Sequence, residues 1–250
     1  MESPWTLTLV SVLVISLVSF IGLVTVFVNQ KRLQSTIFVL VSLAVGAMLG
    51  DAFIHLLPEA FEQTQGSHAT SLYCLLGILI FFVLEKFLLW RHDHATEEHT
   101  HPIHPVGYMN LLADGLHNFI DGVLIGASFM VSIPIGFATT VAVLLHEIPQ
   151  EIGDYGVLLH AGFSRSRALW LNFLTATLAI AGALLALFLG VRVEGFTKIV
   201  LPLAAGGFIY IAGSDLVPEL HKERQPDKAA IQFIGIAVGI GFMFLLTFFE

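Results

Sequence analysis

The sequence predicts an all-α polytopic membrane protein with eight transmembrane helices. Of the 250 residues, 56% are hydrophobic and only 12% are charged, and the mean hydropathy is +0.85. This composition lies far outside that of soluble globular domains. Apolar segments of roughly 20 residues, the length that crosses a bilayer core, recur along the chain. The connections between them are short, so we expect a single transmembrane domain over residues 1–250.

The charged residues of the connections predict how the spans are oriented. Lys and Arg gather in or beside alternate connections, which the positive-inside rule places in the cytoplasm, with both termini outside. We therefore expect a multi-pass protein of the cell membrane, plasma or inner, with the lipid bilayer as a partner. The sequence has no basic patch suited to a nucleic acid. The expected spans are residues 5–29, 36–58, 71–90, 107–131, 134–161, 167–190, 196–217 and 229–249.

The first and third spans carry no obvious ligand. Small residues along the first span favour close packing against other helices. Glu85 and Lys86 lie near the inner end of the third span. We expect them to form an ion pair whose side chains extend to the membrane surface. Cys74 is the single cysteine, which excludes an intramolecular disulfide and a thiolate cluster. Metal ligands must therefore come from His, carboxylate and amide groups.

The second and seventh spans share a pattern of small residues, acids and a Pro-Glu pair. When Pro58 is aligned with Pro218, Gly46 meets Gly206. The two spans run in opposite directions, so the pattern predicts an inverted repeat of spans 1–3 and 6–8 around a central hairpin of spans 4 and 5. Chance similarity between two short segments is the alternative.

The connection over residues 91–105 is rich in histidine, proline and charge. Such a composition argues against a packed structure. Histidine-rich tracts bind first-row metals loosely, so we expect a metal-binding cytoplasmic loop; a solvated linker is the alternative. Its histidines are His92, His94, His99, His101 and His104.

The fourth and fifth spans carry the highest density of groups able to bind a cation. The connection at residues 131–134 is too short for anything but an antiparallel hairpin. Residues four apart in a helix share a face, so each helix presents vertical pairs of ligands. The pairs are His117 with Asp121, His146 with Gln150, and Glu147 with Glu151.

Both motifs lie deep in the membrane. From the span ends, His117 and His146 are each expected roughly 15–18 Å deep, near the midplane. An ionised side chain there costs about 2.5–3.5 kcal/mol, and neither motif contains Lys or Arg. A divalent ion balances this charge best; polar packing without an ion is the alternative. Mixed imidazole and carboxylate ligation suits Zn²⁺, and also Fe²⁺ or Mn²⁺.

The sixth and eighth spans complete the expected bundle. Asn172 in the sixth span could add an amide oxygen to the site or form a hydrogen bond between helices. The eighth span is apolar, and Gly235 and Gly239 within it indicate a helix contact.

A zinc protease is the alternative class of protein. His146-Glu147 begins like the H-E-x-x-H motif, in which two histidines hold zinc and the glutamate is the general base. The second histidine is replaced by Gln150, and Pro149 interrupts the regular helix. These changes remove a zinc ligand, so we expect that the protein is not an enzyme.

Three motifs together carry a family resemblance. They are His117-Asn-x-x-Asp121-Gly on the fourth span, His146-Glu-x-Pro-x-Glu-x-Gly-Asp154 on the fifth, and Gly-Asp-x-x-x-His-Leu-Leu-Pro at residues 50–58. The chain thereby resembles the ZIP (Zrt-, Irt-like) metal transporters, and most of all their histidine-rich branch. The resemblance covers all eight spans, the external termini and the histidine-rich loop.

This resemblance implies a homodimeric divalent-metal importer with a two-metal centre between the fourth and fifth spans. It also suggests that spans 1, 4, 5 and 6 shift against spans 2, 3, 7 and 8. Gln150 departs from that branch, which usually has His there, and a neutral amide is a weaker ligand. Glu151 could be a ligand, a proton acceptor or an exit step. By position, the primary ion would be held by His117, Asp121, His146 and Gln150, and a neighbouring ion by Asn118 and Glu147 with Asp121 and Gln150 shared.

We therefore expect uptake of Zn²⁺ into the cytoplasm, with Cd²⁺, Fe²⁺ or Mn²⁺ as other possible substrates. A carrier and a channel share these sequence features. The expected pathway residues are Asp51, His55, Glu59, Asp114, Asp154, His160, Asn172, Asp215, Glu219 and His221.

Overall fold

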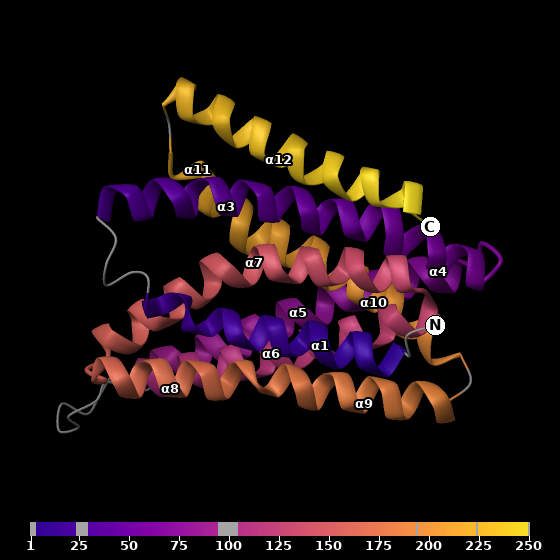
Figure 1. Ribbon diagram of the computed structural model, residues 1–250, viewed down its shortest axis with the longest axis horizontal. Coiled ribbons are helices and arrows are strands. Elements are labelled where there is room, and N and C mark those ends of the chain that lie inside the picture. Colours follow the sequence, from indigo (N-terminus) through magenta and orange to yellow (C-terminus); the bar gives the residue numbers. More distant parts are fainter. Residues whose placement is uncertain (1–3, 24–29, 95–104, 194, 224, 250) are drawn as a thin grey trace.

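The computed structural model describes residues 4–23, 30–94, 105–193, 195–223 and 225–249, and every regular element among them is helical. These elements form eight spans: α1 (Pro4–Val18) with η1 (Ser19–Ile21); α3 (Gln30–Gly50), η2 (Asp51–Leu56) and α4 (Leu57–Gln63); α5 (His68–His94); α6 (Pro105–Val131); α7 (Ile133–His160); α8 (Arg165–Ala176) with α9 (Leu178–Arg192); α10 (Phe196–Ile211), η3 (Ala212–Leu216) and α11 (Val217–His221); and α12 (Pro226–Leu246) with η4 (Thr247–Phe249). The first span begins and the last ends at the same end of the bundle (Figure 1).

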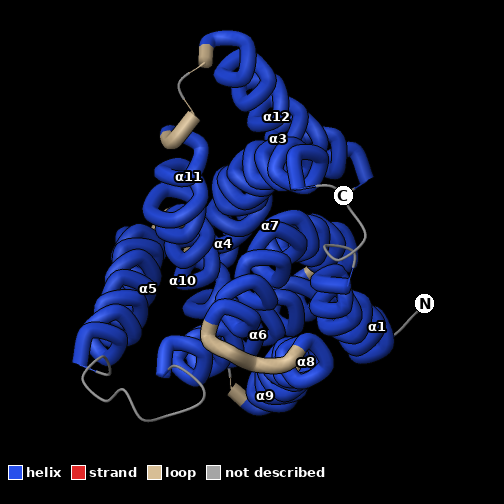
Figure 2. The backbone as a smooth tube through the Cα atoms, turned by 90° about the vertical axis from the view of Figure 1, so that its left-hand side faces the viewer, coloured by secondary structure: helices blue, strands red, loops and turns tan. Residues whose placement is uncertain are grey.

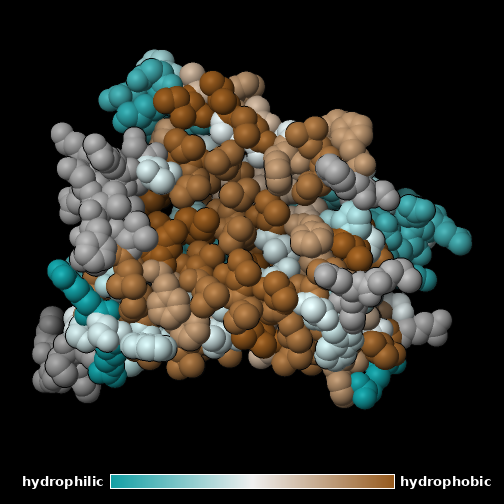
Figure 3. All heavy atoms as spheres, in the orientation of Figure 1, coloured by the Kyte–Doolittle hydropathy of each residue, from teal (hydrophilic) through white to brown (hydrophobic). Residues whose placement is uncertain are grey.

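The eight expected helices are confirmed, and most of their described ends lie within a few residues of the expected ones; the second span is longer than expected and runs from Gln30 to Gln63. Residues 24–29, expected at the end of the first span, lie outside the described residues. In Figure 3 the surface is apolar across the middle of the helices and hydrophilic toward both ends, as a bilayer requires. The described segments that are long and apolar enough to cross a membrane are Pro4–Ile21, Thr36–Gln63, Arg165–Arg192, Phe196–His221 and Pro226–Leu246. The helices with the His and carboxylate motifs, α6 and α7, are not among them.

The inverted repeat is visible in the helix geometry. The second and seventh spans both switch from α-helix to π-helix, at residues 51–56 and 212–216. In both spans the α-helix resumes at the residue before the aligned prolines Pro58 and Pro218. Proline has no amide proton to donate, and a widened turn accommodates the break in the hydrogen-bond ladder. The packing follows the same symmetry, because α3 lies against α12 while α10 lies against α5 (Figure 2).

The aligned glycines of the repeat make equivalent helix contacts. A Cβ on Gly46 would lie 3.0 Å from the Cα of Gly239 on α12. A Cβ on Gly206 would lie 3.0 Å from the carbonyl carbon of Cys74 on α5. Both distances are tighter than van der Waals contact, so each span touches its neighbour backbone to backbone.

The predicted central hairpin is also confirmed. Helix α6 ends at Val131, and the hydroxyl of Ser132 caps α7 by accepting a hydrogen bond from the Ile135 amide at 3.3 Å. Helix α6 is held against α9 by Gly122, where any side chain would meet the Ala179 backbone. This contact fixes the helix that carries the first metal motif.

The sixth span differs from the single helix expected, because α8 and α9 meet at a turn at Thr177. The Thr177 hydroxyl donates to the carbonyl of Leu174 at 2.6 Å. Threonine hydroxyls that bond to backbone carbonyls compete with the helical ladder. The Thr177 side chain is one such competitor at the interruption.

Candidate metal centre

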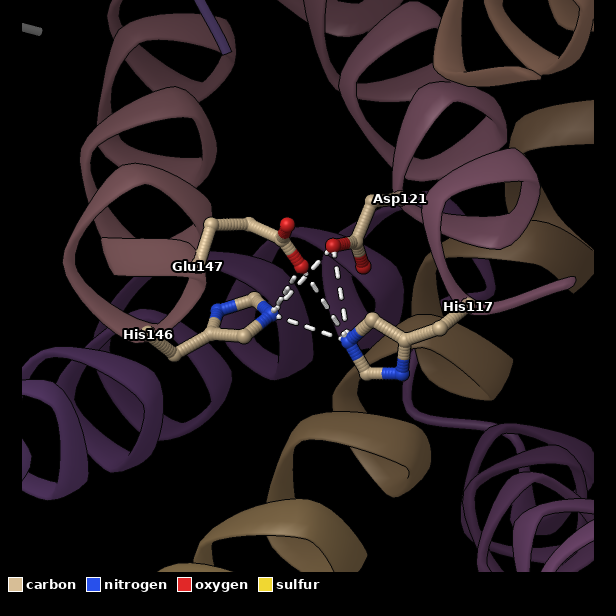
Figure 4. A group of neighbouring side chains, drawn as sticks. All are labelled: His117, Asp121, His146 and Glu147. Atoms are coloured by element: carbon tan, nitrogen blue, oxygen red, sulfur yellow. Dashed lines mark hydrogen bonds and ion pairs between the residues drawn. The ribbon is translucent and has the colours of Figure 1, made fainter. Parts of the chain in front are cut away.

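Four side chains converge between α6 and α7, two from each helix (Figure 4). His117 and Asp121 come from α6, and His146 and Glu147 come from α7. Each offers one ligand atom, and the four atoms lie within 4.8 Å of one another. The imidazole Nε2 atoms are 3.1 Å apart. Among the described residues, no other His, Cys, Asp and Glu side chains form such a group.

Five of the six distances among the four ligand atoms are close to the edge length of a zinc tetrahedron, and the sixth, between the two carboxylate oxygens, is at most 4.8 Å. The Asp121 Oδ2 atom lies 3.6 Å from His117 Nε2 and 3.2 Å from His146 Nε2. Glu147 Oε1 lies 3.5 Å and 3.6 Å from the same two nitrogen atoms. A regular tetrahedron with metal–ligand bonds of about 2.0–2.1 Å has edges of about 3.3–3.4 Å. The side chains present can therefore hold a four-coordinate Zn²⁺ with little movement.

The cluster is buried, and no Lys or Arg among the described residues pairs with its acids. The side chains of Asp121, His146 and Glu147 are at most 1% exposed, while His117 is 17% exposed. The carboxylate oxygens of Asp121 and Glu147 accept no hydrogen bond from the described residues. The sequence contains no Lys or Arg between Arg91 and Arg165. A buried carboxylate must be protonated or paired with a positive charge, and a divalent cation provides such a charge.

A backbone contact fixes which nitrogen of His146 faces the centre. Its Nδ1 lies 3.1 Å from the carbonyl of Ala142, one turn earlier on α7. A carbonyl only accepts, so Nδ1 carries the proton and donates it. The Nε2 lone pair is then directed at the centre, as in metal-bound histidines whose other nitrogen donates to a carbonyl.

The predicted ligands Asn118 and Glu151 make hydrogen bonds one layer away from the cluster. The Asn118 amide donates to Asp114 Oδ1 at 2.7 Å on the same helix. Glu151 accepts a hydrogen bond from the Asn172 amide on α8. Asn118, Glu151 and Asn172 are fully buried. Asn172 thus forms the hydrogen bond between helices that was one of its two predicted roles.

The predicted ligand Gln150 lies on the wall of a cavity of about 530 Å³ that reaches His117. Most of the wall is apolar and comes from α3, α5, α6, α7 and α10. Its polar lining includes several of the predicted pathway residues. These are Asp114, Asp154, Asp215 and Glu219, alongside His117 and Gln150.

The predicted residues of the second span lie on η2 and α4. Asp51 is fully buried and accepts a hydrogen bond from the Thr139 hydroxyl of α7 at 2.9 Å. His55 Nε2 lies 3.0 Å from the carbonyl of Met243 on α12. Glu59 accepts a hydrogen bond from Gln63 at 2.8 Å.

The remaining predicted residues lie at the opposite end of the bundle. His160 ends α7 and His221 ends α11, and both are exposed. Glu219 pairs with Lys222 on the surface. His92 and His94 belong to the last turn of α5. His99, His101 and His104 lie outside the described residues.

Sequence reasoning missed two threonines that hold buried acids. Thr139 donates to Asp51, and Thr175 of α8 donates to Asp114 Oδ2. Their signal in the sequence is weak, since a threonine in an apolar helix commonly bonds to its own backbone. Only the packing of α7 and α8 reveals their partners.

An eight-span helical bundle with a buried cluster of His and carboxylate groups is typical of a membrane transporter of the divalent-metal class. The family model described as "ZIP Zinc transporter" matches residues 3–104 and 90–247. The chain belongs to the ZIP family. It is therefore a transporter and not an enzyme, and the protease alternative is set aside.

Curated relatives agree with this assignment. The chain is 39% identical over 224 residues to "Zinc transporter ZIP13" of Pongo abelii, covering 84% of this chain and 66% of that protein. It is 32% identical to "Zinc transporter ZIP13 homolog" of Drosophila melanogaster, covering 98% and 89%. It is 32% identical to "Zinc transporter SLC39A7" of Rattus norvegicus, covering 98% and 73%.

Proposed function

We propose that this protein moves Zn²⁺ from outside to the cytoplasm through the centre between α6 and α7. The near-tetrahedral arrangement of two imidazole nitrogens and two carboxylate oxygens is the observation that carries this proposal. Tetrahedral nitrogen and oxygen ligation favours Zn²⁺ over the octahedral cations Mg²⁺ and Ca²⁺. Cd²⁺, Fe²⁺ and Mn²⁺ are the competing substrates to test. The names of the curated relatives support zinc as the substrate.

The proposed route follows acidic and histidine side chains from one end of the bundle to the other. The ion passes Glu59, His55 and Asp51 and then enters the centre, for which we propose Asn118, Gln150 and Glu151 as further ligands. It leaves by the cavity that His117 and Gln150 line. The exit residues are Asp114, Asp154, His160, Asp215, Glu219 and His221, with Asn172 holding Glu151 and the loop histidines collecting the ion.

The proposed assembly is a homodimer in the cell membrane with both termini outside. Transport requires the centre to open to each side in turn. We propose that α1, α6, α7, α8 and α9 move together against the other spans. The most extensive helix contacts support this grouping, because they join α6 to α9 and α7, α3 to α12, and α10 to α5; the contact of α3 with α7 is the largest between the two groups.

Uptake of ⁶⁵Zn into proteoliposomes tests the proposal. We expect saturable uptake by the native chain, near-complete loss in His117→Ala and His146→Ala, and native uptake in His68→Ala, whose exposed histidine starts α5. Competition with Cd²⁺, Fe²⁺ and Mn²⁺ ranks the substrates. Linear uptake would indicate a channel. No uptake by well-folded native protein would refute the proposal.

A further inference from the structure

Asn118 is held in one orientation by Asp114. Its Nδ2 donates to Asp114 Oδ1 at 2.7 Å and lies 3.3 Å from the Asp114 backbone carbonyl. Both acceptors lack a proton to donate in return, so the amide must present its NH₂ group to them. The other end of the amide, Asn118 Oδ1, is buried and has no hydrogen-bond partner among the described residues.

Asp114 is in turn held by the neighbouring helix. Its second oxygen, Oδ2, accepts a hydrogen bond from the Thr175 hydroxyl of α8. The carboxylate, only 3% exposed, therefore accepts one bond from α6 and one from α8. Bonds from two helices fix the carboxylate more firmly than either bond alone, because it can no longer rotate about χ2 without losing a partner.

The orientation of the amide decides where its oxygen lies. The Oδ1 and Nδ2 atoms are attached to the same carbon and point about 120° apart. Since Nδ2 reaches back one turn to Asp114, Oδ1 points away from Asp114. Asp121, three residues later, lies on that side of α6. The oxygens of Asp121 and Glu147 there also accept no hydrogen bond from the described residues.

We propose that Asp114, itself fixed by Thr175, is a positioning residue that holds the Asn118 amide with its oxygen toward the metal centre. This inference rests on the proposed function. Without the carboxylate the amide can turn over and present NH₂, which has no lone pair to bind a cation and repels it. Asp114 therefore acts through Asn118, on the side of the centre formed by Asp121 and Glu147.

A double-mutant cycle on purified full-length protein tests this inference, with Cd²⁺ and Zn²⁺ affinity measured by calorimetry. Losing the partner that orients a metal ligand typically weakens metal binding by about 10–100-fold. We expect Asp114→Ala and Asn118→Ala each to weaken binding by about this factor. The double variant should be no weaker than either single variant, because both remove the same interaction. Additive losses, or unchanged affinity in Asn118→Ala, would overturn the inference.

A second pair of variants distinguishes loss of the Thr175 contact from misfolding of the protein. Thr175→Val, which keeps the side-chain shape, should weaken binding severalfold, and Thr175→Ser should restore it. Thr177→Val is the matched control on the same span, because its hydroxyl donates to the carbonyl of Leu174. Equal affinities for Thr175→Val and Thr175→Ser would contradict the role of this contact. Failure of the native protein to bind either metal would instead refute the proposed function.

Discussion

Replacing Gly122 by alanine should force α6 away from α9 and weaken metal binding. A Cβ at this position would lie 2.6 Å from the carbonyl carbon of Ala179 and 2.8 Å from its Cα. Carbon atoms in contact lie about 3.5–4.0 Å apart, so the helices must separate by about 1 Å. Overpacking of this kind costs about 1–3 kcal/mol. A chain of this size loses about 2–4 °C in Tm for each kcal/mol. Because α6 carries His117 and Asp121, the shift also opens the tetrahedron.

Thermal unfolding in detergent and Zn²⁺ titration of the same samples measure both effects. Gly241→Ala is the matched control, because a Cβ on Gly241 meets none of the described atoms within 4 Å. Alanine there should be neutral or stabilise the helix by about 0.5–1 kcal/mol. If Gly122→Ala melts at the same temperature as Gly241→Ala and binds Zn²⁺ with native affinity, close α6–α9 packing does not position the centre.

Three further outcomes follow from the site. Acidification from about pH 8 to about pH 5 should weaken Zn²⁺ binding, because imidazole and carboxylate ligands bind metal only when deprotonated; equal affinity at both pH values in a calorimetric titration would contradict this. Gln150→His should tighten Zn²⁺ binding, because imidazole is the stronger ligand and residue 150 shares a cavity wall with His117; an unchanged Kd would mean that residue 150 does not reach the ion. Thr139→Val should lower the free energy of unfolding by about 1.5–3 kcal/mol, because its hydroxyl donates to the buried Asp51 carboxylate. Thr140→Val, whose hydroxyl donates to the Gly136 carbonyl, is the control, and equal Tm values for the two variants would count against the Asp51 contact.

Much of the fold was predictable because hydropathy and helical spacing are local properties. The eight spans follow from apolar segments long enough to cross a bilayer. The inverted repeat follows from the aligned pairs Gly46 with Gly206 and Pro58 with Pro218, and the matching π-helical turns and glycine contacts confirm it. The break at Thr177 was not predicted, because no proline or glycine marks it.

The centre was predictable only in part, because sequence spacing gives the helix face and not the side-chain partner. The four-residue spacing identified His117 with Asp121, and the structure brings both to the cluster. The same spacing paired Glu147 with Glu151, yet the Glu151 carboxylate bonds to Asn172, 21 residues away on α8. The contact between Asp51 and Thr139 spans 88 residues. Such pairs depend on how α7 and α8 are rotated within the bundle, which local patterns do not encode.

The central claim is that His117, Asp121, His146 and Glu147 bind the transported ion together. An anomalous-difference map at the zinc absorption edge, from crystals of the zinc-loaded protein, tests it most directly. The account predicts a peak about 2.0–2.1 Å from both imidazole Nε2 atoms and from one oxygen of each carboxylate. In crystals of His146→Ala this peak should be lost or much weaker. A map whose zinc peaks all lie away from these four side chains would contradict the account.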